Sequence, residues 1–263
     1  MTTTPQQVID DSIDVAALEE FAARYGDPHL GPVCIVIAAY REAASLPVVL
    51  DALPRETSGL DTRVLVVDDG SDDRTADVAR ECGVFVCRTP ENRGQGAALR
   101  LGYRGAARYG ANYVVTTDAD GQYDPRDIPS VLGPIVSGRA DFVSGSRRLG
   151  STYRGNNLRR TGVVVYAKLI SLLTGQAITD PSFGLRAMRA EVPAALELRE
   201  PQYQASELLI EAAMRGFRLA EVPATMRQRA AGSSRKGPDL LYGARFGRVV
   251  VATWWRERRH QRR

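Results

Sequence analysis

The chain has 263 residues, of which 44% are apolar and 25% are charged, and its formal net charge is +4. This composition is ordinary for a globular protein and excludes collagen-like, disulfide-scaffold and wholly disordered chains. The charge is uneven, because residues 1–29 hold six acidic residues and one Arg while residues 240–263 hold seven Arg and one Glu.

The first half of the chain alternates between two patterns. After a polar lead over residues 1–11, which we expect to be disordered, helical spacing predicts a helix at Ser12–Tyr25. Apolar runs then predict five buried strands, at Val33–Ala39, Arg63–Val67, Val84–Cys87, Tyr113–Thr117 and Asp141–Ser144. Helical patterns follow the first four, at Ser45–Leu53, Thr75–Cys82, Gln95–Tyr109 and Asp124–Val136. This alternation predicts an α/β fold with a mostly parallel sheet, whose ligands lie at the carboxyl ends of the strands.

The pattern is less regular after residue 150. We expect helices at Asn157–Leu173, at Ser206–Arg215 and from Asp239 onward, with short strands at Phe183–Met188 and Arg218–Val222. Residues 228–238 have the composition of a flexible, basic loop. We expect no transmembrane helix, because no apolar run is long enough, and no signal peptide, because residues 1–14 are polar and acidic.

Cysteine and histidine are scarce. The three Cys residues show no C-x-x-C spacing, and Cys34 and Cys87 fall in predicted strands as small core residues. This usage is typical of a reducing compartment, so we expect a cytoplasmic protein without zinc. The two His residues, His29 and His260, lie near the ends of the chain, which disfavours chemistry that needs a His base.

Two carboxylates, Asp68 and Asp69, end the second predicted strand. Burying both without partners is costly, so they need hydrogen-bond donors. Capping of the next helix by Asp69, Ser71 or Asp73 is one interpretation. The other is that one Asp accepts hydrogen bonds from a bound base or ribose.

The third strand leads into the segment Glu91–Gly96, which superficially begins a G-x-G-x-x-G fingerprint. Leu99 stands where the third Gly belongs, which disfavours NAD binding. The backbone amides at the start of the following helix would still suit an anion.

The fourth strand ends in Asp118-Ala119-Asp120-Gly121-Gln122. On extended backbone this spacing puts three oxygen ligands on one side, which suits Mg²⁺ or Mn²⁺. The alternative is a polar loop or an Asp cap. After the fifth strand, Arg147 is followed by further arginines at Arg148, Arg154, Arg159 and Arg160, which favours a phosphate ligand over a merely solvated face.

Seven strings occur in the order of a known family: IVIAAYREAASL, VLVVDDGSDDRTADVA, ENRGQGAALRLGY, VVTTDADGQYDP, DFVSGSR, TDPSFGLRAM and EVPATMRQRAAGSSRKG. Over roughly residues 33–237 the chain resembles a family 2 glycosyltransferase with the GT-A fold. The polyprenyl- or dolichyl-phosphate mannose and glucose synthases are the most similar branch. The combination of DDGS, DADGQ and GSR is specific, whereas each string alone is weak.

The resemblance implies roles for individual residues. Asp118, Asp120 and Gln122 would bind the metal, and Asp120, Asp180 and Arg147 would be catalytic. The nucleotide sugar would meet Ala39, Tyr40, Glu42, Asp68, Asp69, Arg93, Gly94, Asp118 and Ala119. Phosphate groups would meet Arg147, Arg160, Arg229 and Ser233.

Some positions depart from the family pattern. Ala38 replaces a usual Pro, Arg41 a usual Asn and Gln95 a frequent Lys. The Q-x-x-R-W string of processive members is absent, which argues against a polysaccharide synthase.

The resemblance implies an inverting transfer of a hexose from a UDP- or GDP-sugar to a polyprenyl phosphate. Such an acceptor needs no general base, because a phosphate monoester with a second pKa of about 6 is mostly dianionic at neutral pH. A soluble hydroxyl acceptor is the alternative, with Asp180 and Glu207 as candidate bases. A nucleotidyltransferase would need a Gly-rich loop with Arg and Lys after the first strand, which AAYREAAS lacks. An intact metal triad argues against a non-catalytic scaffold, and only the basic tail favours a nucleic-acid partner, which we do not expect.

The last helix is amphipathic. On a helical wheel five arginines share one face, namely Arg245, Arg248, Arg256, Arg259 and Arg263, and Leu240, Val250, Val251 and Trp254 lie opposite. Trp with Arg suits the surface of an anionic membrane, at its cytoplasmic face. The alternative is a helix docked on its own domain. We therefore expect three regions: a lead and short helix at 1–30, a GT-A domain at 31–237 and this helix at 238–263.

Overall fold

The computed structural model describes residues 12–26, 28–152, 157–228 and 239–261. Its strands are β1 (Val33–Ala39), β2 (Glu56–Thr57), β3 (Leu60–Asp68), β4 (Phe85–Arg88), β5 (Tyr113–Thr116), β6 (Phe142–Thr152), β7 (Arg186–Arg189) and β8 (Leu219–Met226). Its helices are α1 (Ser12–Tyr25), α2 (Leu46–Asp51), α3 (Thr75–Glu81), α4 (Gln95–Arg108), the 3₁₀ turn η1 (Pro125–Asp127), α5 (Ile128–Val136), α6 (Asn157–Thr174), α7 (Glu191–Ala194), α8 (Gln204–Met214) and α9 (Asp239–His260). The predicted lead and most of the predicted basic loop lie outside the described residues.

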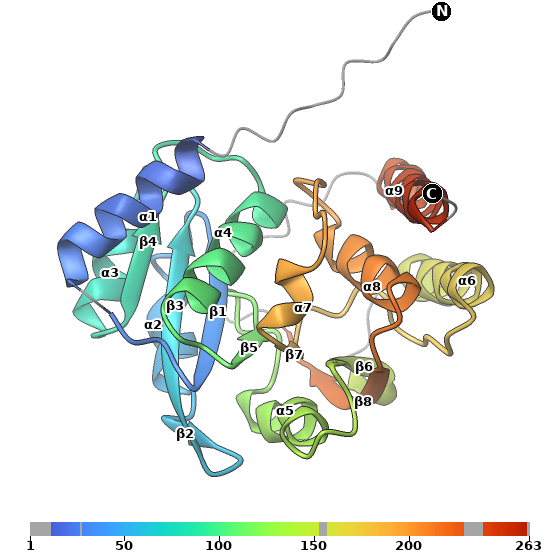
Figure 1. Ribbon diagram of the computed structural model, residues 1–263, viewed down its shortest axis with the longest axis horizontal. Helices are drawn as coiled ribbons and strands as arrows, with labels where there is room; N and C mark the ends of the chain where they lie inside the picture. Colours follow the sequence, from blue (N-terminus) through green and yellow to red (C-terminus); the bar gives the residue numbers. More distant parts are fainter. Residues whose placement is uncertain (1–11, 27, 153–156, 229–238, 262–263) are drawn as a thin grey trace, which may run out of the picture.

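One mixed sheet organises the molecule (Figure 1). Its order is β2-β3-β1-β5-β7-β6-β8, with β4 also paired to β3. Strands β4, β3, β1 and β5 run parallel, as predicted, and the pairing of β1 with β3 brings Ala39 opposite Asp68. Strand β7 runs antiparallel to both β5 and β6, so the sheet is largely rather than wholly parallel.

The core has two layers, one on each face of the sheet. Along β1, Cys34 and Val36 point to the layer formed with α1, α4, α7, α8 and α9, while Val33, Ile35 and Ile37 point to the layer formed with α2, α3 and α5. This alternation is the two-residue period of a strand buried on both faces. Cys87 is also buried, as predicted for a core residue, and Cys82 is exposed.

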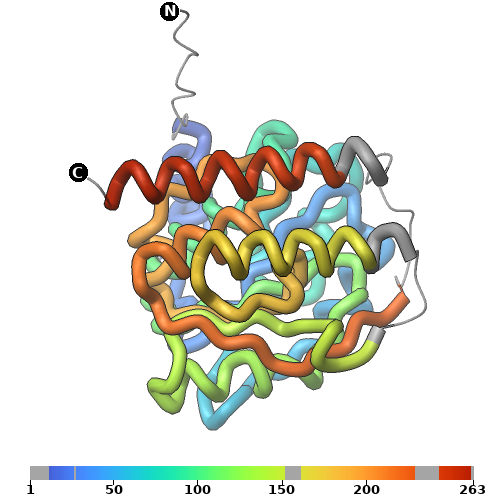
Figure 2. Tube along the Cα trace, turned by 90° about the vertical axis from the view of Figure 1, so that its right-hand side faces the viewer, coloured from blue at the N-terminus to red at the C-terminus, as the bar shows by residue number. Residues whose placement is uncertain are grey.

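Helix α9 docks on its own domain. Phe246, Val249 and Val250 are buried against α6 and α8, and Figure 2 shows α6 and α9 side by side across one face of the molecule. The helical wheel grouped Arg256 with four other arginines on the face expected to meet a membrane, but its guanidinium instead reaches Glu207 of α8 (2.9 Å). Across the described residues, no helix is both long and apolar enough to cross a membrane.

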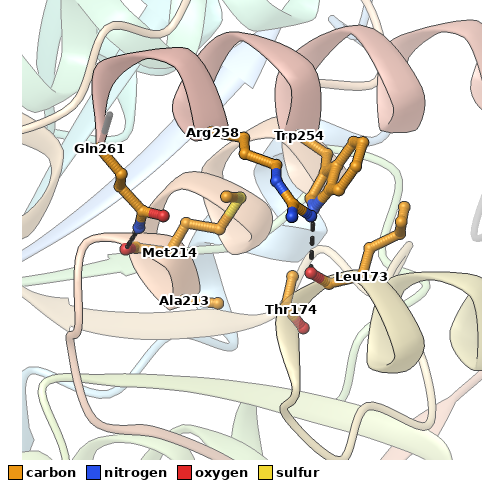
Figure 3. Close-up of a pocket in the computed structure, with 7 residues that line it drawn as sticks. All are labelled: Leu173, Thr174, Ala213, Met214, Trp254, Arg258 and Gln261. Carbon is orange, nitrogen blue, oxygen red and sulfur yellow. Dashed lines mark hydrogen bonds between the residues drawn. The ribbon is translucent and has the colours of Figure 1, made fainter. Parts of the chain in front are cut away.

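The C-terminal end of α9 is fixed by two hydrogen bonds beside a cavity of about 450 Å³, which lies between the ends of α6, α8 and α9. The Trp254 indole N–H donates to the Leu173 carbonyl (3.0 Å), and the Gln261 amide donates to the Met214 carbonyl (Figure 3). None of the residues that line this cavity comes from a strand end, where the sequence predicts the ligands to bind. The candidate site therefore lies elsewhere in the molecule.

Candidate functional site

The carboxyl end of β3 is hydrogen-bonded to the start of α4. Both oxygens of Asp69 accept hydrogen bonds from the Arg93 amide (3.0 and 3.1 Å), and one also accepts from the Gly94 amide (2.7 Å). Burial raises the pKa of Asp69, while these donors oppose the rise. Residues 93–96, here called the glycine turn, are thus bound to the strand end that the sequence assigned to the nucleoside.

Two expected nucleotide contacts are already engaged inside the protein. Asp68 is fully buried, accepts from the Ser71 amide (3.1 Å) and pairs with Arg88 (3.2 Å). The Arg93 guanidinium pairs with Asp14 of α1 (2.5 Å), so only its backbone meets Asp69. Of the three capping candidates, none occupies the N-cap of α3, which is Arg74, although the Asp73 carboxylate accepts a hydrogen bond from the amide of Thr75, the first residue of the helix (3.0 Å).

The end of β1 forms the neighbouring wall. Ala39 is buried, and the Arg41 guanidinium lies 5.2 Å from the centroid of the Tyr40 ring. The Glu42 amide donates to Thr75 Oγ1 (2.9 Å), and the Glu42 carboxylate accepts from Ser45 Oγ (2.5 Å). The Asp69 amide donates to the Ala39 carbonyl (2.9 Å), which places the first-strand motif beside the Asp68–Asp69 pair.

The D-x-D-x-Q segment follows β5. Asp118 Oδ1 accepts a hydrogen bond from the side-chain Nε2 of Gln95 (3.0 Å), which links it to the glycine turn. Asp120 is buried and accepts from the Gln122 backbone amide (3.0 Å). The Gln122 side-chain nitrogen donates to the Arg227 carbonyl (3.4 Å), which leaves the amide oxygen as its remaining acceptor.

This donor set fits a hard divalent cation. Two carboxylates and an amide oxygen are ligands that Mg²⁺ and Mn²⁺ favour. Within the described ranges, no three His, Cys, Asp or Glu side chains gather closely enough to hold a metal. A cation at Asp118, Asp120 and Gln122 would therefore draw its other ligands from substrate oxygens or water.

Arg147 lies on β6 directly after Ser146, where the pairing of β6 with β8 shifts register, and several hydrogen bonds hold its side chain. Its Nε donates to Asp180 Oδ2 (2.6 Å), and one terminal nitrogen donates to Asp180 Oδ1 (3.2 Å) and to Ser182 Oγ (3.1 Å). Asp180 is fully buried, whereas the Arg147 side chain is 20% exposed. Asp180 thus orients a guanidinium that reaches the surface, and both of its oxygens are committed.

A tight contact joins Arg147 to the D-x-D segment. Arg147 lies over the Phe183 ring (5.5 Å), which packs on the Tyr123 ring (4.6 Å), and the Tyr123 hydroxyl accepts from the Gly184 amide (2.9 Å). A Cβ at Gly184 would lie 3.2 Å from Asp118 Oδ1. The pKa of Tyr123 is raised by burial and by Asp118, and Arg147 opposes the rise. Carboxylate, aromatic pair and guanidinium therefore form one wall.

Some expected residues are placed differently or lie outside the described part. Glu207 is fully buried under α9 and pairs with Arg256, so it is no candidate base. Arg160 belongs to α6, but its side chain is outside the described residues, as are Arg154, Arg229 and Ser233 entirely.

Sequence reasoning missed two residues of this wall. Tyr123 had the strongest available signal, since it directly follows the D-x-D-x-Q string. Arg186 lies in the TDPSFGLRAM string that matches the family, but it was assigned no role. It is buried and donates to the carbonyls of Phe183 (2.6 Å) and Ala205 (2.7 Å), which fixes the loop after Asp180.

Comparison with known proteins gives this geometry a context. Residues 34–194 match the family model described as glycosyl transferase family 2. The chain is 36% identical over 226 residues to a dolichyl-phosphate hexose transferase of Haloferax volcanii, covering 86% of this chain and 95% of that protein. It is 30% identical over 238 residues to an undecaprenyl-phosphate mannosyltransferase of Micrococcus luteus, covering 85% of this chain and 93% of that protein.

Among solved structures, the chain is similar to glucosyl-3-phosphoglycerate synthase from Mycobacterium tuberculosis in complex with Mn²⁺, UDP and phosphoglyceric acid. The TM-score is 0.65 at 26% identity, and the match covers 92% of this chain and 82% of that one. The overall architecture is therefore the GT-A arrangement that the sequence predicted.

Proposed function

This chain belongs to glycosyl transferase family 2 and is a hexosyltransferase, and we propose that it transfers the hexose from a nucleoside diphosphate sugar to a polyprenyl phosphate. The observation that carries the proposal is the wall described above, where Asp118 and Arg147 flank one aromatic pair. Carboxylates that can hold a cation, beside an oriented guanidinium, suit a departing diphosphate. The relatives of 36% and 30% identity are named for dolichyl- and undecaprenyl-phosphate acceptors.

Each part of the site has a task in this reaction. The strand ends at Asp68–Asp69 and Ala39–Glu42 would seat the nucleoside. Asp118, Asp120 and Gln122 would hold Mg²⁺ or Mn²⁺, which supplies Lewis-acid stabilisation of the charge on the leaving group. Arg147 would add fixed positive charge there, held in place by Asp180. The acceptor oxygen would attack the anomeric carbon from the opposite side, which inverts its configuration.

Apart from the proposed metal ligands Asp118 and Asp120, the described residues of this wall offer no carboxylate base, which supports a phosphate acceptor. Asp180 is bound to Arg147 on both oxygens, and Glu207 is buried and paired with Arg256. A phosphate acceptor attacks without losing a proton, because at neutral pH it is mostly dianionic. A hydroxyl acceptor is the second candidate, since the similar solved structure was determined with phosphoglyceric acid bound.

A transfer assay tests the proposal. Purified protein with Mn²⁺ is given one donor labelled in its sugar: UDP-glucose, UDP-N-acetylglucosamine or GDP-mannose. The acceptor is either a polyprenyl phosphate or phosphoglyceric acid, and solvent extraction separates the products. We expect the labelled hexose to appear on the polyprenyl phosphate with one of these donors. Labelled product on phosphoglyceric acid alone would favour the hydroxyl acceptor instead.

The metal assignment predicts that Asp120→Asn lowers kcat at least about 100-fold, because the cation would lose a charged ligand at the developing charge. Asp127→Asn is the matched control, since its carboxylate accepts from the Thr225 amide in the same region without belonging to the D-x-D-x-Q string. Full activity in Asp120→Asn would remove the metal assignment.

A polyprenyl phosphate resides in a membrane, and we propose that the α6–α9 face meets its surface. Exposed apolar side chains on α6 and α9 and the arginines of α9 support this contact. Co-sedimentation with anionic vesicles tests this contact.

A further inference from the structure

Helix α9 contacts residues 197–203, the segment between α7 and α8, here called the bridging segment. Arg256 donates to the Glu197 carbonyl (3.3 Å), and Arg248 pairs with the Glu200 carboxylate (3.1 Å). Phe246 meets the Tyr203 ring edge-on, with 5.8 Å between the ring centroids. In Figure 1 this segment lies between α4 and α9.

The other side of the bridging segment meets the glycine turn. The Gly96 amide donates to the Pro201 carbonyl (2.8 Å). The approach is so close that a Cβ at Gly96 would lie 2.1 Å from the Glu200 carbonyl oxygen, and one at Gly94 would lie 2.7 Å from the Pro201 oxygen. The position of the turn therefore depends on where these two carbonyls are held.

Buried Glu207 anchors the bridging segment just before these two carbonyls. Its two oxygens accept hydrogen bonds from the Arg199 amide (2.8 Å) and the Glu200 amide (2.9 Å). Tyr203, with a φ of 61°, lies in the left-handed region that non-glycine residues avoid, so the surrounding contacts impose this conformation. A buried carboxylate needs a countercharge, and Arg256 supplies it to both Glu207 and Glu211.

We infer that Arg256 is a positioning residue for nucleotide-sugar binding. Through Glu207 and the bridging segment it keeps the glycine turn against Asp69, and it thereby keeps Gln95 against Asp118. The C-terminal helix is thus coupled to the donor site. The identity of the ligand rests on the proposed function, whereas the chain of contacts does not.

Hydrogen exchange tests the coupling without any ligand. In Arg256→Ala, the amides of residues 93–96 should exchange about tenfold faster than in the wild type, while those of β1 should keep their rates. Arg215→Ala is the matched control. Arg215 pairs with Glu257 and Glu211 in the same interface, yet its backbone contact is the Ala195 carbonyl, outside the bridging segment. We expect its exchange at residues 93–96 to stay within about twofold of the wild type.

Nucleotide binding gives the second readout. With Mn²⁺, UDP and GDP are titrated calorimetrically into each variant. For the nucleotide that the wild type binds, Arg256→Ala should raise Kd about tenfold and Arg215→Ala no more than about twofold. Arg256→Lys should return Kd to within about threefold of the wild type, because its ammonium can still neutralise Glu207.

Hydrogen exchange at residues 93–96 decides the inference. Equal exchange at residues 93–96 in Arg256→Ala and Arg215→Ala would overturn it, since α9 would then only stabilise the domain. If Arg256→Ala unfolds, shown by fast exchange in β1, Arg248→Ala replaces it. Arg248 contacts the bridging segment through its ion pair with Glu200, and its side chain is 66% exposed, so its loss should not unfold the protein. If exchange at residues 93–96 in Arg248→Ala is the same as in the wild type, the coupling is overturned. A wild type that binds neither UDP nor GDP would refute the proposed function, and the exchange result would still decide the coupling.

Discussion

Asp180 is fully buried, and Arg147 and Ser182 use both of its oxygens. Asp180→Asn keeps the shape of this side chain but removes the charge that orients Arg147. We expect kcat to fall about 10- to 100-fold, because a guanidinium displaced by a fraction of an ångström stabilises the leaving group less well. The KM for the donor should change less than kcat. Steady-state kinetics with the donor from the transfer assay measures both constants.

The control for this prediction is Arg148→Ala. Arg148 follows Arg147 on β6, and its side chain is exposed, so its loss should leave kcat within about twofold of the wild type. Arg147→Lys should behave like Asp180→Asn, because an ammonium cannot make the forked contact with one carboxylate. If Asp180→Asn retained full kcat, Asp180 would have no part in orienting Arg147.

At the scale of elements, the sequence was most informative where the pattern is local. The continuous apolar run predicted β1 residue for residue, and helical spacing did the same for α1. The reversal of β7 and the four-residue α7 were not predicted, because strand direction depends on distant pairing and one helical turn leaves no periodicity. For the same reason the wheel misplaced Arg256. Its partner Glu207 is 49 positions away, and no local pattern records such a pair.

The packing of α8 against α9 also predicts a pH dependence. Burial raises the pKa of Glu211 from 4.5 to about 7, although Arg256 opposes the rise. Folded protein therefore binds more protons than unfolded protein between these two values, so this group's stabilisation is full below pH 4.5 and is lost as the pH rises through 7. Between pH 5 and pH 8 the free energy of unfolding should fall by about 2 to 3 kcal/mol through this group.

Urea denaturation at pH 5 and pH 8 measures this effect. Glu211→Gln keeps an acceptor for the Glu197 amide but cannot ionise, so the variant should lack this loss of stability. Relative to the wild type, its free energy of unfolding should therefore rise by about 2 to 3 kcal/mol between pH 5 and pH 8. Glu197→Gln is the control. The pKa of Glu197 is lowered from 4.5, chiefly by its hydrogen bond with Arg199, so this residue does not titrate between pH 5 and pH 8 and its replacement should leave the pH dependence unchanged. Parallel pH dependences for wild type and Glu211→Gln would show that Glu211 does not titrate in this range.

At the scale of the whole molecule, apolar exposure is concentrated on one face. Seven large apolar side chains are exposed among the described residues, and four of them lie on α6 or α9: Val165, Leu172, Val251 and Trp255. The two helices lie side by side (Figure 2), and Arg248, Arg258 and Arg259 are exposed on the same helix as Trp255. Leu172 is 82% exposed, which costs nothing at a bilayer interface and is unfavourable in water.

This face predicts binding to anionic vesicles. Exposed apolar side chains that enter the interface each contribute on the order of 1 kcal/mol, and each nearby Arg adds about as much where anionic lipids are present. The double variant Val251→Glu with Trp255→Glu should therefore weaken co-sedimentation with phosphatidylglycerol vesicles at least about tenfold, since tenfold corresponds to 1.4 kcal/mol. Val15→Glu with Val48→Glu is the matched control. It changes two exposed valines on α1 and α2 (50% and 64% exposed), elements of the opposite end of the sheet, and should leave binding unchanged. Equal loss in both double variants would assign the binding to net charge rather than to the α6–α9 face, and no binding by the wild type would remove the membrane contact from the proposal.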